Sequence, residues 1–396
     1  MVILGLSFTE MCSSTEQTRS RVVLIILHFG EKWPLLYPPF LVGAAANSEL
    51  DFVIVSNLDT LPMLGSFNPP NIRLHQLSVP ALNQLLQDKL QRPPEVAITL
   101  RTAYKLVDFK TMFAHLFPDI VAGYEFWGHI DADTLPSRIV SPHFLDPSML
   151  DDYDIISGTN GMCNGPFQLY RNRHDINVLF RNSKDFRGVV DGNFSSGFTE
   201  NHGEMRMPHA LLIRRHVIKE KATWNHTANT YLEDRWYFRH GAARNHIWSP
   251  KWNLRLRWDD DGLFQETISH DRTSVSPTTG NAVPGFFHLI SWKYLADFRL
   301  PMPDKVLANL RRTHGRLVYV SCHGFHAVDD INDAAARAAV ERESLKACVF
   351  PKQEVFFRVG TMWACVGGVN GYDNMVKIFN NNKAKHAKKA TRRGGM

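Results

Sequence analysis

Continuous apolar runs recur along the first third of the chain and predict buried strands. The run VVLIILHF covers 22–29 and ends at Gly30, and DFVIVSN covers 51–57. The stretch IRLHQLS, at 72–78, alternates in character, and a further apolar run, FWGHI, covers 126–130. Short runs rich in β-branched residues are typical of strands that are buried on both faces, as in a parallel sheet.

Helical patterns separate these runs. A helix is expected over 38–49, where two prolines occupy the first turn, and another over 79–92, which Pro93 and Pro94 end. Residues 100–117 carry apolar side chains at helical spacing and predict a third helix. Alternating strands and helices predict an α/β fold, with a mostly parallel, doubly wound central sheet flanked by helices and connected by right-handed crossovers.

The second half of the chain has a different pattern. Strands are expected at 153–158 and 166–172, and the glycine-rich polar stretch 190–206 predicts a loop near the strand ends. Two apolar runs and one helical run after residue 300 are expected to form a C-terminal appendage. The predicted organisation has four parts: a disordered N-terminus at 1–20, an α/β domain at 21–300, the appendage at 301–375 and a basic disordered tail at 376–396.

Composition indicates a folded protein without a nucleic-acid-binding face. Hydrophobic residues make up 44% of the 396 residues and charged residues 21%, a balance typical of globular chains. The formal charge of +6 equals the charge of the Lys and Arg residues between 383 and 393. Without that tail the chain is formally neutral, so no specific nucleic-acid binding is expected. Contact between the tail and RNA or an anionic membrane is a second reading.

Cysteine spacing argues against a zinc-binding or disulfide-rich protein, and hydropathy argues against a membrane-spanning one. The five cysteines are scattered without a C-x-x-C pair, which argues against a zinc site or a disulfide framework. The first 20 residues resemble neither a good signal peptide nor a membrane span, and no transmembrane segment is expected elsewhere. We therefore expect a cytoplasmic protein as the sequence is written, or a Golgi-type lumenal protein if an upstream anchor is missing.

Two carboxylates, Asp131 and Asp133, directly follow the apolar run 126–130. Asp is common where a strand ends and the chain turns, so a turn is one reading. Carboxylate oxygens also suit Mg²⁺ or Mn²⁺, which keep open coordination positions for substrate phosphates. Residues i and i+2 of a strand share a face, so both carboxylates can address one ion. Gly30 and Asn57 follow two other predicted strands, so we expect a ligand site at this edge of the sheet.

The segment 103–135 resembles the donor-binding segment of GT-A-type glycosyltransferases, which use nucleotide sugars. In that family, a helix bearing a basic residue leads into a strand that ends in D-x-D. Together ILHFGEKWP, DFVIVSN, YKLVDFK and FWGHIDAD resemble a group of glycosyltransferase-like proteins related to polysaccharide biosynthesis enzymes. The resemblance covers residues 22–300 and implies a GT-A-like fold. It also implies transfer of a sugar from a nucleoside diphosphate donor, with a UDP-sugar favoured, to a glycan or other hydroxyl acceptor.

The resemblance implies a role for each matching position. The two aspartates, with His288 completing the metal shell, would bind Mn²⁺ or Mg²⁺ and, through it, the donor diphosphate. The stretch HLISWK resembles a late histidine-plus-lysine element, but it departs from the H-F-x-G-x-x-K form. Phe29 and Gly30 would lie against the nucleotide base, and Asn57 would reach the base or the ribose. Lys105 would lie near the ribose or a phosphate, with Asp108 one turn later, and Lys293 would contact the diphosphate.

Several of these residues also have an ordinary structural reading. Phe29 and His288 fit a hydrophobic core, and Lys105 with Asp108 fits a helix ion pair three residues apart. A catalytic base is sought among the polar residues after 190, because an inverting transferase needs a carboxylate near the acceptor hydroxyl. Glu200 is the first candidate and Asp234 the second.

Two other functions remain open. The stretch IDADTL also resembles the D-x-D-x-T signature of haloacid-dehalogenase-type phosphatases, in which the first Asp is the nucleophile. That nucleophile normally follows the first strand of its domain, whereas several predicted strands precede Asp131. A non-catalytic carbohydrate-binding protein is the other function, because tryptophans and arginines gather in 224–258 and suit stacking on sugars.

Overall fold

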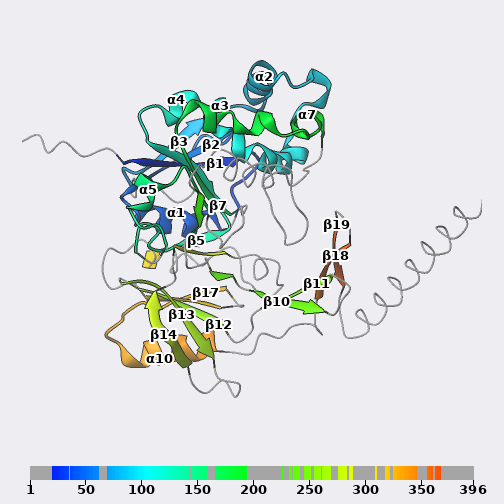
Figure 1. Ribbon diagram of the computed structural model, residues 1–396. Helices are drawn as coiled ribbons and strands as arrows, with labels where there is room; N and C mark the ends of the chain where they lie inside the picture. The colour runs from blue at the N-terminus through cyan, green and yellow to red at the C-terminus, as the bar shows by residue number, and fades with distance from the viewer. Residues whose placement is uncertain are drawn as a thin grey trace, which may run out of the picture.

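The computed structural model shows a seven-stranded central sheet and three smaller sheets (Figure 1). The residues that it describes are 20–34, 36–61, 69–142, 144–157, 166–193, 224–226, 232–233, 235–240, 245–250, 254–259, 261–268, 275–282, 285–288, 308–309, 317–321, 324–345, 355–359 and 362–366.

The strand order of the central sheet is β3-β2-β1-β4-β7-β6-β8. Neighbours from β3 to β4 are parallel, β7 is antiparallel to both β4 and β6, and β8 is parallel to β6. The predicted α/β class is confirmed as a mixed, largely parallel sheet flanked by helices. The strands are β1 (Val22–His28), β2 (Leu50–Ser56), β3 (Ile72–Gln76), β4 (Phe126–Ile130), β6 (Ile155–Ser157), β7 (Phe167–Arg171) and β8 (Trp224–His226).

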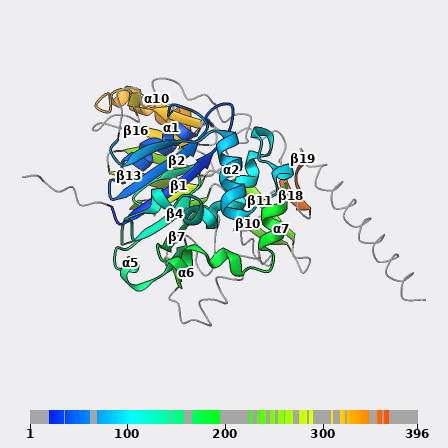
Figure 2. The same ribbon diagram turned by 90° about the horizontal axis from the view of Figure 1, so that it is seen from above.

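Helical segments cover both faces of the central sheet, as Figures 1 and 2 show. Val23 and Ile25 of β1 pack in one core with residues of α2, η2, α3 and α7, while Leu24 and Ile26 pack in a second core with α1. This alternation explains the continuous apolar runs, since both faces of each strand are buried. The helical segments are α1 (Tyr37–Ala45), α2 (Val79–Leu90), η1 (Pro94–Val96), η2 (Leu100–Met112), α3 (Phe113–Leu116), α4 (Pro118–Val121), α5 (Met149–Asp152), α6 (His174–Asn177), η3 (Leu179–Asn182) and α7 (Phe186–Asp191).

Local sequence signals set the ends of α2, which was predicted over 79–92. The Ser78 side chain accepts a hydrogen bond from the Ala81 amide at 3.2 Å and caps the first turn. Gln91 adopts the left-handed conformation, with φ of 54°, and its amide donates to the Leu86 carbonyl. Within the described ranges, no helix is both long and apolar enough to cross a membrane.

The segment predicted as an α-helix over 100–117 is instead a 3₁₀-helix, η2, followed by the single turn α3. The reason is that apolar residues recur at every third position. Ala103, Leu106, Phe109 and Met112 all pack in the core shared with α2, α3 and α7, which is called the core above the sheet. A 3₁₀-helix has three residues per turn, so these four side chains form one row along it. The prediction of an α-helix was wrong. The same stretch also contains apolar residues at spacings of three and four, and this pattern is typical of an α-helix.

Three smaller sheets follow. Strand β12 pairs with both β13 and β16, so one sheet crosses the domain boundary expected at residue 300. Strands β11 and β18 pair across the same boundary. The three sheets contain β14 (Val275–Ala282), β13 (Gly262–Ile268), β12 (Leu254–Asp259), β16 (Leu317–Ser321) and β17 (Gly324–Ala327); β10 (Arg235–His240), β11 (Asn245–Pro250), β18 (Val355–Val359) and β19 (Met362–Val366); and β5 (Thr134–Pro136), β15 (Phe286–His288) and β9 (Leu232–Glu233).

A buried arginine joins the five-stranded sheet to the helix α10 (Ala334–Ser344). The Arg255 guanidinium lies 2.6 Å from a Glu266 carboxylate oxygen and donates to the Ser344 hydroxyl at 2.8 Å. It also lies 4.2 Å from the centre of the Tyr319 ring. These contacts satisfy a charge that is 3% exposed and connect segments on both sides of residue 300.

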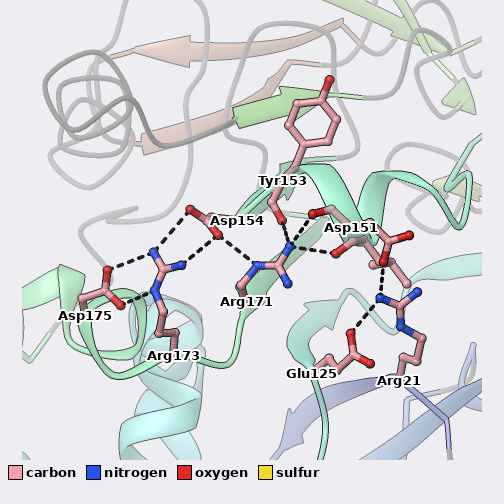
Figure 3. A network of polar contacts seen from close by, with 9 residues as sticks. Arg21, Glu125, Asp151, Tyr153, Asp154, Arg171, Arg173 and Asp175 are labelled. Atoms are coloured by element: carbon pink, nitrogen blue, oxygen red, sulfur yellow. Dashed lines mark hydrogen bonds and ion pairs between the residues drawn. The ribbon is translucent and has the colours of Figure 1, made fainter.

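A network of ion pairs lies at the amino ends of β1 and β4 (Figure 3). Arg21 bridges Glu125 and Asp151, at 2.7 Å and 2.6 Å. Arg171 donates to the Asp154 carboxylate and to the carbonyls of α5 and the residues beside it, and it stacks on the Phe126 ring at 4.7 Å. This edge is opposite to the carboxyl ends of the parallel strands, so the network stabilises the sheet away from the expected ligand site.

Two glycines give a test of this packing. A Cβ at Gly128 of β4 would clash with the Gln168 carbonyl oxygen and lie 2.7 Å from Leu169 Cδ2, whereas one at Gly188 of α7 would have no described atom within 4 Å. We expect Gly128→Ala to lower the free energy of unfolding by about 3 kcal/mol or more. We expect Gly188→Ala to raise it by up to about 1 kcal/mol, because alanine favours a helix. Urea unfolding monitored by circular dichroism measures both, and equal effects would contradict the described β4–β7 packing.

Candidate functional site

The carboxyl ends of β1 and β4 lie at the point where the strand order changes direction. From β1 the sheet continues through β2 and β3 on one side and through β4 on the other. Pairing between β1 and β4 ends at Leu24 and Gly128, while β1 continues along β2 as far as His28. The two strands therefore stop pairing before β1 ends. Ligands of open α/β sheets bind at such a switch point.

Asp131 and Asp133 lie at the end of β4, in a tight connection to β5. The Asp131 amide donates to the Pro166 carbonyl at 2.9 Å. The Asp131 carbonyl accepts from the Thr134 amide at 3.2 Å and from the Thr134 hydroxyl at 2.7 Å. The turn, one of the two readings of these aspartates, is present in the structure. It uses the backbone of Asp131, and both aspartates are half-buried.

Lys110 of η2 contributes a cation to this strand end. Its ammonium forms an ion pair with the Asp131 carboxylate, and the two side chains are only 11% and 25% exposed. The family resemblance implied the basic role for Lys105, and no sequence pattern pointed to Lys110. The two residues are five positions apart, so the rotation of the helical segment decides which of them reaches the strand end.

Lys105 and Asp108 form an ion pair in the core. The Lys105 ammonium donates to the Asp108 carboxylate at 2.8 Å and to the Val189 carbonyl of α7 at 2.7 Å. Both side chains are at most 1% exposed. The structural reading of these two residues therefore explains their position, and the structure gives them a role in holding η2 against α7.

A second buried cation acts beside Lys105. The Arg92 guanidinium donates to the carbonyls of Val190 and Gly192, the second at 3.1 Å. Burial lowers its pKa from the usual value. Two cations thus meet the carbonyl end of α7, where the last carbonyls of a helix lack helical partners.

Gly30 and Asn57 are brought together, as the parallel arrangement predicts. The Gly30 amide donates to Asn57 Oδ1 at 2.8 Å, and Asn57 Nδ2 donates to the Gly30 carbonyl at 2.9 Å. Asn57 thereby fixes the chain after β1. Phe29 is 5% exposed and belongs to the core above the sheet, which agrees with its structural reading.

A group of aromatic rings at the end of β1 was not identified from the sequence. His28 stacks on Trp33, with ring centres 4.9 Å apart, and Trp33 lies 4.7 Å from the Tyr37 ring. His28 and Trp33 are half-buried, and burial lowers the pKa of His28 from its usual value. The half-exposed aromatic rings at this strand end are therefore His28 and Trp33, whereas Phe29 is buried.

The three-stranded sheet brings distant backbone segments to the aspartates. Strand β5 begins directly after Asp133, and its Thr134 is paired in register with His288 of β15. His288 is in turn paired with Glu233 of β9. The backbone of His288 is therefore next to the D-x-D turn, and Glu233 is one strand further away. Glu200, Asp234 and Lys293 lie outside the described residues.

The two aspartates fit one hard divalent cation by their donor chemistry. Mg²⁺ is usually held by one or two carboxylates and keeps several waters or substrate phosphates as its other ligands. Among the described side chains, there is no group of three or more His, Cys, Asp and Glu residues that could enclose a metal. Asp131 and Asp133 supply two carboxylates, which is the number that such a site uses.

A family model matches most of the chain. A family model described as "Family of unknown function (DUF6625)" matches residues 24–297, which include all the residues of this site. A search of the curated proteins finds no match for the chain.

The buried pair in the core can be tested by its stability. We expect Asp108→Ala to lower the free energy of unfolding by about 3–5 kcal/mol, because it leaves the Lys105 ammonium buried without its carboxylate. Asp175→Ala removes one partner of the exposed Arg173 pair and is the matched control, with an expected loss within about 1 kcal/mol. Urea unfolding measures both. Equal losses would show that the Lys105–Asp108 pair does not stabilise the core.

Proposed function

This chain belongs to the DUF6625 family, and we propose that it is a metal-dependent glycosyltransferase with a GT-A-like fold. It would transfer a sugar from a nucleoside diphosphate donor, a UDP-sugar being favoured, to a glycan or other hydroxyl acceptor. The observation that supports this most is the position of Asp131 and Asp133. They follow β4 at the topological switch point, where an open α/β sheet binds its ligand.

The electrostatics of the site suit a diphosphate. Two carboxylates can hold a divalent cation, and Lys110 adds a positive charge beside Asp131. A divalent cation bound there would supply the charge that stabilises a departing diphosphate. Hydrogen bonds to Pro166 and Thr134 hold the backbone of Asp131 and so fix the point from which its carboxylate projects.

The end of β1 would receive the nucleoside. Asn57 holds the backbone of Gly30 through two hydrogen bonds, so this turn keeps one conformation. The half-buried rings of His28 and Trp33 offer aromatic surface at the same strand end. Aromatic side chains are suited to stacking on bases. Rate enhancement would then come from positioning the donor and from stabilising its leaving group.

The phosphatase alternative has less support. In the stretch IDADTL, Thr134 follows Asp133 directly, so the sequence departs by one residue from the D-x-D-x-T signature. Asp131 also follows the fourth described strand along the chain, β4, rather than the first. A non-catalytic sugar-binding protein would share the aromatic residues but would not need the paired carboxylates.

Nucleotide binding tests the proposal. Isothermal titration with UDP and GDP, with and without Mn²⁺, would measure the affinity of the protein and of an Asp131→Asn, Asp133→Asn double variant. We expect Mn²⁺-dependent binding of UDP that the double variant weakens by about 100-fold or more, equivalent to about 2.7 kcal/mol. The matched control is Asp119→Asn, Asp152→Asn, which removes two exposed carboxylates elsewhere.

Two outcomes would contradict the proposal. If neither nucleotide binds under any condition, the transferase function is wrong, and hydrolysis of a phosphate monoester becomes the next assay. If UDP binds equally well to both double variants, the D-x-D carboxylates do not hold the donor.

A further inference from the structure

Lys110 is bound to one oxygen of the Asp131 carboxylate, an oxygen that a metal ion could also use. Its ammonium is in direct contact with the Asp131 carboxylate, in a pair that is mostly buried. An ammonium group is a compact cation with three donors, and a carboxylate oxygen in contact with it is unavailable to a second cation at the same position. The ion pair and a metal bond at the same oxygen, Asp131 Oδ1, are therefore competing states, and two cations beside one carboxylate also repel each other.

The helical segment around Lys110 is firmly packed. Phe109 and Met112, on either side of it, are fully buried in the core above the sheet. The next turn is held to β4, since the Phe113 ring contacts the His129 ring edge to face with centres 6.4 Å apart. The backbone of Lys110 is therefore fixed relative to Asp131, and only its flexible side chain can move between partners.

We infer that Lys110 is an exchangeable counter-cation, which pairs with Asp131 when no metal is bound and moves to the donor diphosphate when a divalent cation binds Asp131. This inference rests on the proposed function. A mostly buried ammonium is costly without a paired anion. When Lys110 leaves Asp131, the diphosphate that binds with the metal is the anion that pairs with it. The exchange makes the bare metal a weak ligand and couples its binding to that of the nucleotide.

The inference predicts effects of opposite sign for one substitution. Lys110→Gln removes the competing cation, so Mn²⁺ alone should bind about five-fold more tightly. The same variant lacks the positive charge that would contact the diphosphate, so UDP at saturating Mn²⁺ should bind about five-fold more weakly. Free Mn²⁺ is measured by electron paramagnetic resonance, and UDP affinity by isothermal titration.

Two further variants separate charge from folding. Lys110→Arg keeps a cation at this position and should leave both affinities close to those of the unchanged protein. Lys184→Gln removes an exposed lysine elsewhere and is the matched control for net charge. Circular dichroism and thermal unfolding show whether each variant is folded before its affinities are compared.

The outcomes distinguish this inference from the proposed function. If Lys110→Gln weakens UDP binding but leaves Mn²⁺ affinity unchanged or lower, Lys110 does not compete with the metal, and the transferase proposal stands without the exchange. If Mn²⁺ binds more tightly to Lys110→Gln but UDP binds to no variant, competition at Asp131 is supported and the donor assignment falls. Absence of Mn²⁺ binding in every variant overturns both.

Discussion

Segment η2 turns once every three residues, and this period sorts its side chains into three rows. One row, Ala103, Leu106, Phe109 and Met112, packs in the core above the sheet. A second contains Lys105 and Asp108, whose ion pair reaches α7. The third ends in Lys110, beside the D-x-D turn. With the 3.6-residue period of an α-helix these rows would rotate away from their partners, so core, buried pair and site cation all depend on the tighter helix.

The charges of this region are placed in a consistent way. Lys105 and Arg92 lie at the carbonyl end of α7, where their positive charge faces the negative end of the helix dipole. Asp108 compensates Lys105 in the core, and Lys110 compensates Asp131 at the strand end. The first pair is at most 1% exposed, whereas Asp131 is 25% exposed. Because of this difference in solvent access, the Lys105–Asp108 pair can only stabilise the fold, whereas a ligand can reach the Lys110–Asp131 pair.

Much of the α/β core could be predicted because its signals are local. Apolar runs with both faces buried gave the strands around 22–29 and 51–57, and Pro93 with Pro94 marked the end of the helix expected over 79–92. The meeting of Gly30 and Asn57 also follows from sequence, because the carboxyl ends of parallel strands share one edge.

Other parts of the site depend on geometry that no local pattern specifies. Lys110 and Asp131 are 21 residues apart, and they meet only because η2 has a three-residue period. Strands β5, β15 and β9 have two or three residues each and join segments far apart in the chain, so their sequences carry no periodic signal. The family resemblance implied a metal-ligand role for His288. The backbone register places this residue beside Thr134, and the ligand role stays a prediction.

The pairing of β12 with β16 has a practical consequence for shortening the chain. The family match ends at residue 297, which invites a fragment that stops there. Such a fragment would keep β12, β13 and β14 but lose β16 and β17, leaving the backbone donors and acceptors on one side of β12 unpaired. An open strand edge pairs readily with other chains. The boundary of sequence similarity is therefore a poor boundary for a soluble fragment, and the sheet argues for keeping the chain at least as far as the end of α10.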